Sequence, residues 1–461
     1  MSSARSMGGD TPDSLETRFA TRMGALLGPD FPSDIALAVS GGGDSMAMLT
    51  LAHNWTRVWG VRLWVVTVDH GLRDGSAAEA AMVARTCAEL GHPHATLRWH
   101  WDGVGNLQSE ARTARLRLID RWRQGISVVL MAHTADDVAE GFLMRLARGS
   151  GVDGLSAMAD DQSVRPHPCA GQLALADHEV TQTATPPMPT RLVAGVPAYS
   201  AGFRVVRPLL RETRDDLRHY LRVLQGEWVD DPSNADMRFD RVRMRRLLTD
   251  LSPHGLGTAR LARTAQHQAR AQVALEARAA DVARKTLTPL LQTGEVLIDR
   301  TGLAEVEAET QLRLLSRALT WVAQAPYRPR LAPLEALLDR VLSGGGGTLH
   351  GCEARIYGDH LRVFREYAAV VGVTAQPGDW WDGRFRLGGV LPKGGYVRAL
   401  GDDGWAARPA DCAHIPYHAA RSLPAVFDVT GFVGCPGLMP DFRVISEFTG
   451  KIPLFTRPMR T

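Results

Sequence analysis

Residues 38–49 read AVSGGGDSMAML and place three consecutive glycines between an apolar run and the start of a helical pattern. The preceding run, residues 34–39, has the composition of a buried strand, and helical spacing begins at Ser45. A strand, a glycine turn and a helix N-terminus together expose backbone N–H groups, and the helix dipole adds partial positive charge. This stretch therefore predicts an anion site.

Two common phosphate loops do not fit these residues. A Walker loop needs a lysine after its second glycine, and none is present here; a dinucleotide fingerprint needs a glycine where the chain has Met46. Ser45 is expected at the helix N-cap, with its hydroxyl facing the anion. Asp44 would repel a phosphate unless Mg²⁺ bridges the two, so Asp44 is a candidate magnesium ligand.

Strand-like and helical runs alternate from residue 34 to residue 149. The strand candidates are 34–39, 61–68, 94–99 and 126–132, and the helix candidates start at Ser45 or span 76–90, 106–122 and 134–149. This alternation predicts an α/β fold whose parallel sheet is covered on both faces. Ligands of such sheets bind at the carboxyl ends of the strands, where Ser40, Asp69 and His133 fall.

The remaining chain suggests further domains. Residues 160–200 are rich in proline and lack periodicity, which is typical of a functional lid or a mobile insertion, and we expect the insertion. The glycine run at 343–347 is a candidate hinge. The expected organisation is a disordered tail (1–14), a nucleotide-binding domain (15–215), a helical domain (216–343) and a small, β-rich C-terminal α/β domain (344–461).

Composition indicates a globular protein. The chain has 461 residues, of which 45% are hydrophobic and 22% charged, with a net charge of +3. No signal sequence or membrane-length apolar run is present, and the five cysteines lack zinc-site spacing, so we expect a cytoplasmic protein with no membrane partner. Arginine is abundant throughout, as GC-rich coding would produce, so only local arginine clusters indicate nucleic-acid binding.

The glycine stretch and several other segments resemble known families. SGGGDS (40–45) resembles the SGGxDS signature of PP-loop ATP pyrophosphatases. In order and spacing, the chain also resembles the tRNA(Ile)-lysidine synthases, at VDHGLR (68–73), NLQSEARTAR (106–115), AHTADDVAEGFLMRLARGSG (132–151), RPLL (207–210) and DPSNADMRFDRVRMR (231–245). The resemblance implies ATP-dependent attachment of free lysine to C2 of cytidine 34 in the CAU anticodon of tRNA(Ile), through an adenylated cytidine.

With this resemblance, the candidate residues take roles. ATP would contact Ser40, Gly41, Gly42, Gly43, Asp44 and Ser45, with Mg²⁺ on Asp44. Arg112 and Arg115, three apart on one helix, could stabilise charge at the α-phosphate, and His133 would be a phosphate contact or proton shuttle. Helix capping explains Asp136. Asp137 and Glu140 share a helical face and are expected to bind substrate lysine or, alternatively, Mg²⁺.

The expected tRNA contacts lie further along the chain. Pro208 would hold Arg207 in an extended segment that reaches the cleft. The candidate RNA-binding residues are Arg207, Asn234, Arg238, Arg241, Arg243 and Arg245. The family spelling has Asn where this chain has Val242, so an amide contact there is in doubt. The oligomeric state, monomer or homodimer, stays open.

Three other functions are less favoured. A PP-loop tRNA thiolase typically needs paired cysteines, which this chain lacks. A small-molecule amidotransferase would leave the arginine cluster and the C-terminal part without a role. A non-catalytic RNA-binding protein would tolerate loss of Asp44, yet the SGGGDS stretch is intact.

Overall fold

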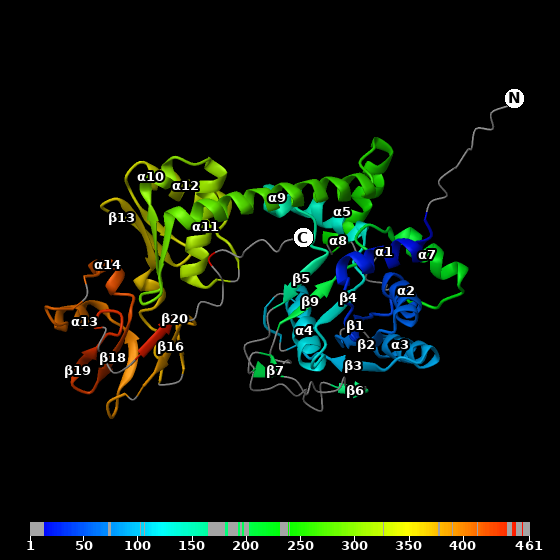
Figure 1. Ribbon diagram of the computed structural model, residues 1–461, viewed down its shortest axis with the longest axis horizontal. Coiled ribbons are helices and arrows are strands. Elements are labelled where there is room, and N and C mark those ends of the chain that lie inside the picture. Colours follow the sequence, from blue (N-terminus) through cyan, green and yellow to red (C-terminus); the bar gives the residue numbers. More distant parts are fainter. Residues whose placement is uncertain are drawn as a thin grey trace. The chain divides into compact units, whose positions relative to one another are not determined.

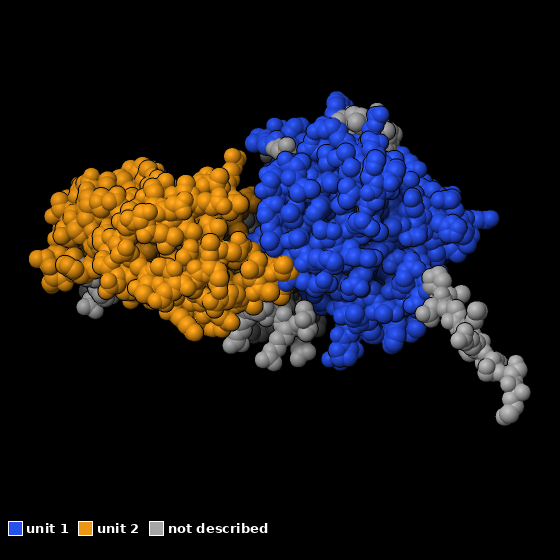
Figure 2. Space-filling view, turned by 90° about the horizontal axis from the view of Figure 1, so that it is seen from above, with its two compact units in different colours: residues 1–270 blue, residues 271–461 orange. Residues whose placement is uncertain are grey.

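The computed structural model describes residues 13–71, 75–101, 103–105, 107–164, 180–182, 192–193, 196–197, 202–230, 238, 240–325, 327–376, 379–389, 391–412, 414–439, 445–448 and 454. The chain forms two compact units, residues 1–270 and 271–461, which Figure 2 colours separately. This division differs from the three folded domains expected from the sequence, whose boundaries were placed after residues 215 and 343.

The first unit is built on a seven-stranded sheet with the order β5-β9-β4-β1-β2-β3-β6 (Figure 1). Its five central strands are parallel: β1 (Asp34–Ala38), β2 (Arg62–Asp69), β3 (His94–Arg98), β4 (Val128–Met131) and β9 (Phe203–Val206). β1 lies between β2 and β4, so the strand order reverses there. The predicted α/β fold is confirmed, and such a reversal is where these sheets bind ligands.

Helices cover both faces of this sheet. Ile35 and Leu37 of β1 pack on one face against α1 (Leu15–Leu27), α2 (Gly43–Trp59), α3 (Ser76–Leu90) and α7 (Arg214–Val223). Ala36 points to the other face, which α4 (Leu107–Trp122) covers. The alternation follows from the two-residue period of a strand.

A second group of helices packs beside the sheet. It comprises α5 (Ala135–Leu146), α6 (Val152–Leu155), α8 (Asp240–Leu251), the 3₁₀ turn η4 (Ser252–His254) and the start of α9 (Thr258–Thr286). Phe142, Leu248 and Leu261 share one apolar cluster that joins α5, α8 and α9. This packing places the N-terminal arginines of α8 beside the acidic residues of α5.

Residues 160–200, expected to be a mobile insertion, supply strands to the sheet. β5 (Asp161–Val164) pairs antiparallel with β9, and β6 (Val180–Gln182) pairs antiparallel with β3, so both edges of the sheet come from this segment. β7 (Leu192–Val193) and β8 (Val196–Pro197) form a separate ribbon. An edge strand presents unpaired backbone N–H and C=O groups, so a segment that lies along it can pair through its backbone without side-chain periodicity. The rest of 160–200 lies outside the described residues.

The second unit contains a five-stranded antiparallel sheet with the order β10-β11-β14-β13-β12. The strands are β10 (Leu287–Leu290), β11 (Glu295–Asp299), β12 (Gly347–Leu349), β13 (Cys352–Tyr357) and β14 (His360–Arg365), with α10 (Arg300–Ala304), α11 (Ala308–Ala323) and α12 (Leu331–Leu342). β10 and β11 come from the segment expected to be helical. The glycine run leads directly from α12 into β12, and Gly345 donates to the Arg340 carbonyl at 2.8 Å, so the described residues show no hinge there.

Two small antiparallel sheets complete this unit. One contains β15 (Trp380–Trp381), β16 (Phe385–Gly388) and β20 (Ile445–Phe448); the other contains β17 (Tyr396–Ala399), β18 (Pro424–Asp428) and β19 (Gly431–Gly434). Short helical turns accompany them: η5 (Tyr367–Ala369), α13 (Gly401–Ala407) and α14 (Tyr417–Ala420). Among the described residues, no helix is both long and apolar enough to span a bilayer.

Candidate active site

The glycine stretch forms a tight loop between β1 and α2. Gly41 has a φ of 86°, a conformation that favours glycine, and α2 starts at Gly43 with Gly42 as its N-cap. The Ser45 hydroxyl donates to the Gly42 carbonyl at 2.9 Å and accepts from the Ser40 N–H at 3.2 Å. Ser45 therefore lies inside the first helical turn instead of at the expected N-cap, and its hydroxyl fixes the shape of the loop.

A cavity of about 800 Å³ opens beside this loop, at the carboxyl ends of β1, β2 and β4. A volume of this size suits a nucleotide. Its charged and titratable lining residues are Asp44, Asp69, His70, Glu79, Arg115, His133, Asp137, Arg214, Arg218, Asp230, Arg238, Arg241 and Arg245. The cavity thus lies where the site was expected, and six of its lining residues are arginines.

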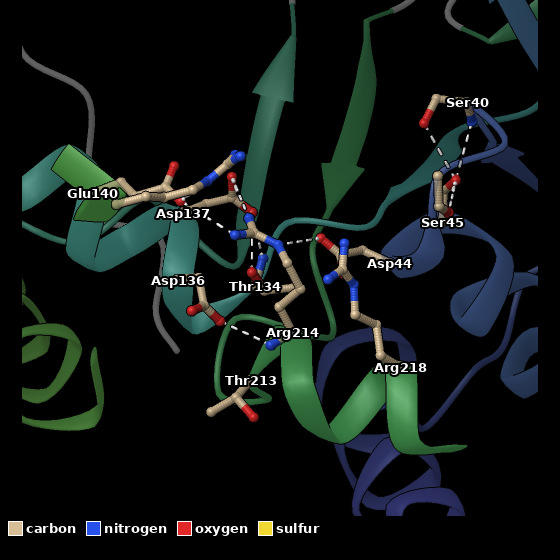
Figure 3. Close-up of polar contacts among 12 residues, drawn as sticks. Ser40, Asp44, Ser45, Thr134, Asp136, Asp137, Glu140, Thr213, Arg214 and Arg218 are labelled. Atoms are coloured by element: carbon tan, nitrogen blue, oxygen red, sulfur yellow. Dashed lines mark hydrogen bonds and ion pairs between the residues drawn. The ribbon is translucent and has the colours of Figure 1, made fainter. Parts of the chain in front are cut away.

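Arg214, the first residue of α7, connects the loop to α5 (Figure 3). Its Nε lies 3.2 Å from Asp44 Oδ2, and its two terminal nitrogens lie 3.3 Å from Glu140 Oε1 and 3.9 Å from Asp137 Oδ1. Its backbone N–H also donates to Asp136 Oδ2 at 2.8 Å. One arginine therefore holds four carboxylates in position.

The charged groups of this cluster change one another's pKa values. Burial alone would lower the pKa of Arg214, but Asp44, Asp137 and Glu140 together raise it above its ordinary value. Burial raises the pKa of Asp44, and the Arg214 guanidinium opposes that rise. Arg214 therefore favours the ionised form of Asp44, which is the form that can bind Mg²⁺.

Thr134 is the N-cap of α5, and Asp136 and Asp137 both lie in the first turn, where carboxylates complement the helix dipole as expected for Asp136. Asp137 Oδ2 accepts a hydrogen bond from the Thr134 N–H at 2.9 Å, and Asp136 instead accepts from the Arg214 backbone. Although burial alone would raise the pKa of Asp137, His133 and the Thr134 N–H outweigh burial and lower it. Asp137 lines the cavity and remains available there as a carboxylate.

Glu140 lies behind the cavity instead of facing it. Its side chain is 1% exposed, and Oε1 accepts from Arg245 Nε at 2.7 Å and from Arg214 at 3.3 Å. Of the two carboxylates expected to bind substrate lysine or Mg²⁺, Asp137 lines the cavity and Glu140 does not. The helical spacing of Asp137 and Glu140 was predicted correctly, but α8 supplies an arginine that covers Glu140.

His133 and the α4 arginines occupy the expected side of the site. Burial lowers the pKa of His133 to about 4, and nearby Arg207, Arg241 and Arg112 add to this, so His133 is neutral at pH 7. Arg115 lines the cavity and approaches His70 Nε2 at 3.4 Å. Arg112 is exposed on the same helix.

Arg207 is placed differently from the prediction. Its side chain is buried, and it donates to the Ala159 carbonyl at 2.8 Å and to Gln162 Oε1 at 2.9 Å. Burial and the charge of Arg112 lower its pKa to about 10. In this structure Arg207 therefore fastens β5 to the sheet and does not reach a surface that tRNA could contact.

The arginine cluster divides into two groups. Arg241 and Arg245, one turn apart on α8, face α5 and pair with Asp137 and Glu140. Arg243 pairs with Asp240 and is half exposed, and Arg238 is exposed. Asn234 lies outside the described residues. We call Arg241 and Arg245, which pair with the acids of α5, the inner arginines, and Arg238 and Arg243 the outer arginines. Arg238 also lines the cavity, and Arg241 is as exposed as Arg243.

The residues at the loop fit a magnesium ion that is shared with phosphates. Asp44 Oδ1 is buried and has no hydrogen-bond partner among the described residues. No cluster of three or more metal-ligating side chains occurs in the described part of the chain. Mg²⁺ bound to a nucleotide commonly uses one or two protein carboxylates and takes its other ligands from phosphates and water.

Comparison with known proteins decides the family. Residues 15–252 match the PP-loop domain family. The chain is 39% identical to the tRNA(Ile)-lysidine synthase of Ruegeria pomeroyi over 88% of each chain, and 32% identical to that of Wolbachia pipientis wMel over 77% of each. The chain belongs to the tRNA(Ile)-lysidine synthase family. It is an ATP-using PP-loop enzyme.

Among solved structures, the U34-tRNA thiolase NcsA from Methanococcus maripaludis resembles 55% of this chain and 79% of its own, at 15% identity and a TM-score of 0.41. This likeness is too distant to bear on function. Family membership therefore rests on the sequence relatives and on the PP-loop domain.

Sequence reasoning missed several residues that line the cavity. Arg214 and Arg218 lie one turn apart on α7, and Asp230 follows that helix. The one local signal was the capping box formed by Thr213 and Asp216, which fixes where α7 begins and so where Arg214 projects. Arg214 is 170 residues from Asp44 along the chain, and no local pattern indicates that contact.

Proposed function

We propose that this enzyme forms lysidine in tRNA(Ile) by ligating free lysine to C2 of cytidine 34 in the CAU anticodon, with ATP converted to AMP and pyrophosphate. The observation that carries the proposal is the glycine loop beside a cavity lined by six arginines and by Asp137. A nucleotide, an anionic RNA and a cationic amino acid all find complementary charge there.

In the first step, O2 of the cytidine attacks the α-phosphorus, and the bond to the pyrophosphate breaks. The Gly43 and Asp44 N–H groups at the start of α2 would hold the pyrophosphate, because helix geometry leaves them without intrahelical acceptors. The Ser45 N–H is already used, since it donates to the Gly42 carbonyl at 3.0 Å. Arg112 and Arg115 would stabilise charge developing at the α-phosphate. Asp44 would hold Mg²⁺, which supplies charge neutralisation at the phosphates.

In the second step, the lysine ε-amine attacks C2, the C2–O bond breaks and AMP leaves. The amine must first lose a proton. His133 lines the cavity, but its pKa of about 4 makes it a weak base, so we assign it as a phosphate contact and not as the proton acceptor. Asp137 would hold the lysine ammonium in the cavity. We assign Glu140 a supporting role through Arg214 and Arg245, because its side chain is 1% exposed.

The tRNA would approach from the side of α8. The outer arginines, Arg238 and Arg243, would contact phosphates, whereas Arg241 and Arg245 face the acids of α5. We keep Asn234 as a proposed contact to an anticodon base. The reaction would take place in the cytoplasm, with the enzyme acting as a monomer or a homodimer.

The test is incorporation of radiolabelled lysine into RNA. Purified enzyme, ATP, Mg²⁺ and labelled lysine are incubated with tRNA(Ile) carrying CAU, and in parallel with the same tRNA carrying uridine at position 34. Label in the first RNA alone is expected. Label in both RNAs, or in neither, would contradict the proposal.

A further inference from the structure

Arg218 has no role in the reaction as described so far, yet it lies directly over the glycine loop. A Cβ atom added to Gly43 would be 3.5 Å from Arg218 Cγ and 3.5 Å from the ring of Trp228. Just beyond Trp228, the Val229 N–H donates to the Gly41 carbonyl at 3.0 Å. α7 and the segment that follows it therefore cover the loop from one side.

The guanidinium of Arg218 is only partly engaged. Its NH2 donates to Asp230 Oδ1 at 2.6 Å, and its Nε is buried without a hydrogen-bond partner among the described residues. Both side chains line the cavity, but Asp230 is 65% exposed and Arg218 36% exposed. Solvent screens an ion pair of this kind, so it is easily exchanged for a stronger partner.

A pyrophosphate in the loop would be that stronger partner. The Gly43 and Asp44 N–H groups, the first two of α2, would point at an anion held beside Gly42 and Gly43. Arginine binds phosphate oxygens with two parallel N–H donors, which a single contact to Asp230 does not use. Figure 3 shows the side chains of Arg214 and Arg218 extending from the same helix toward Asp44. Arg214 is held by carboxylates, whereas Arg218 is free to exchange.

We propose that Arg218 is a phosphate-binding residue that leaves Asp230 when ATP binds and contacts the β,γ-pyrophosphate over the glycine loop. Asp230 is then a competing internal anion. The exchange would make the enzyme select a triphosphate over AMP, because AMP has no phosphate at that position. The inference rests on the proposed function only through its use of ATP.

Binding measurements test both residues, because substitution of Arg218 should weaken phosphate binding and substitution of Asp230 should strengthen it. A non-hydrolysable ATP analogue, inorganic pyrophosphate and AMP are titrated, each with Mg²⁺, into the full-length chain. Arg218→Met keeps the aliphatic contact with the loop, and we expect about tenfold weaker binding of the analogue and of pyrophosphate, the loss of one charge-assisted hydrogen bond. AMP affinity should stay the same. Arg222→Met, on the exposed side of α7, is the matched control.

Asp230→Asn removes the competitor and should tighten binding of pyrophosphate and of the analogue. Equal weakening of AMP and the analogue by Arg218→Met would overturn the proposal, as would unchanged pyrophosphate binding in both variants. A raised KM for lysine, with ATP binding unchanged, would assign Arg218 to the lysine carboxylate and also overturn it. Should Arg218→Met fail to fold, the Asp230→Asn titration decides alone.

Lysidine formation by the unmodified chain is measured in parallel. A chain that binds pyrophosphate through Arg218 but labels no RNA would refute the proposed function and leave this inference standing. A chain that labels RNA but binds pyrophosphate equally well with and without Arg218 would do the reverse.

Discussion

Replacing Arg214 with methionine should move the acid limb of the pH–rate profile to higher pH. Burial already raises the pKa of Asp44, and Arg214 opposes this through a 3.2 Å contact between two largely buried side chains. Without Arg214, the pKa of Asp44 rises further, so a smaller fraction of Asp44 is ionised at any given pH below neutrality. Activity that needs ionised Asp44 must then fall at a higher pH than in the unmodified enzyme.

The size of this change follows from the contact that is lost. A hydrogen bond between charged groups contributes about 1.5–3 kcal/mol. At about 1.4 kcal/mol for each pKa unit, the limb should move by about one to two pH units. The assay is the initial rate of lysidine formation from pH 5.5 to about pH 8.5 at saturating ATP and Mg²⁺, chosen to span the titration of a carboxyl with a raised pKa.

Arg211→Met is the matched control, because Arg211 is exposed and lies three residues before Arg214. Arg214→Lys keeps one positive charge but cannot reach three carboxylates at once. Its acid limb should therefore lie between that of the unmodified enzyme and that of Arg214→Met. An acid limb at the same pH in Arg214→Met and in the unmodified enzyme would refute the reasoning. The contact with Asp44 would then serve packing alone.

Three further outcomes are expected. Asp44→Ala should nearly abolish turnover while tRNA affinity, measured by filter binding, changes little; normal turnover would sink the assignment of Asp44 to Mg²⁺. Arg238→Ala with Arg243→Ala should weaken tRNA binding and reduce the slope of log affinity against log salt by about one for each lost phosphate contact, and an unchanged slope would show that the outer arginines are not RNA contacts. Burial raises the pKa of Glu295 from 4.5 to about 7, despite the nearby Arg362. Between these two pH values the folded chain binds more protons than the unfolded chain, so the free energy of unfolding falls as pH rises. This loss of stability is on the order of 3 kcal/mol and can be measured by hydrogen exchange of the β11 amides as a function of pH. Glu295→Gln should remove the loss, whereas the control Glu353→Gln on β13 should keep it. The same loss in both variants would refute the assignment.

Much of the first unit could be predicted from local pattern. The buried strands β1, β2 and β4 each contain an apolar run, and Gly91 ends α3 at the predicted residue, with a φ of 76°. The edge strands β5 and β6 could not be predicted, because their pairing depends on the open edges of β9 and β3 and not on their own side chains. The same holds for β10 and β11, because β10 pairs with β11, and β11 pairs with the distant β14.

The candidate site divides in the same way. The glycine loop and His133 could be located because strand ends follow from local sequence. The burial of Glu140 and of Arg207 could not, because each depends on an element distant in sequence: α8 covers Glu140, and the loop before β5 covers Arg207. Spacing along one helix indicates which residues share a face, but it does not indicate what packs against that face.

The central claim is that this enzyme breaks ATP between the α- and β-phosphates in order to attach lysine to RNA. The most direct measurement follows α-labelled ATP and tritiated lysine together in one reaction with tRNA(Ile). One AMP and one pyrophosphate should form for each lysine that enters RNA, and no AMP should form when the RNA is omitted. Release of ADP and phosphate, or of AMP without lysine entering RNA, would contradict the claim.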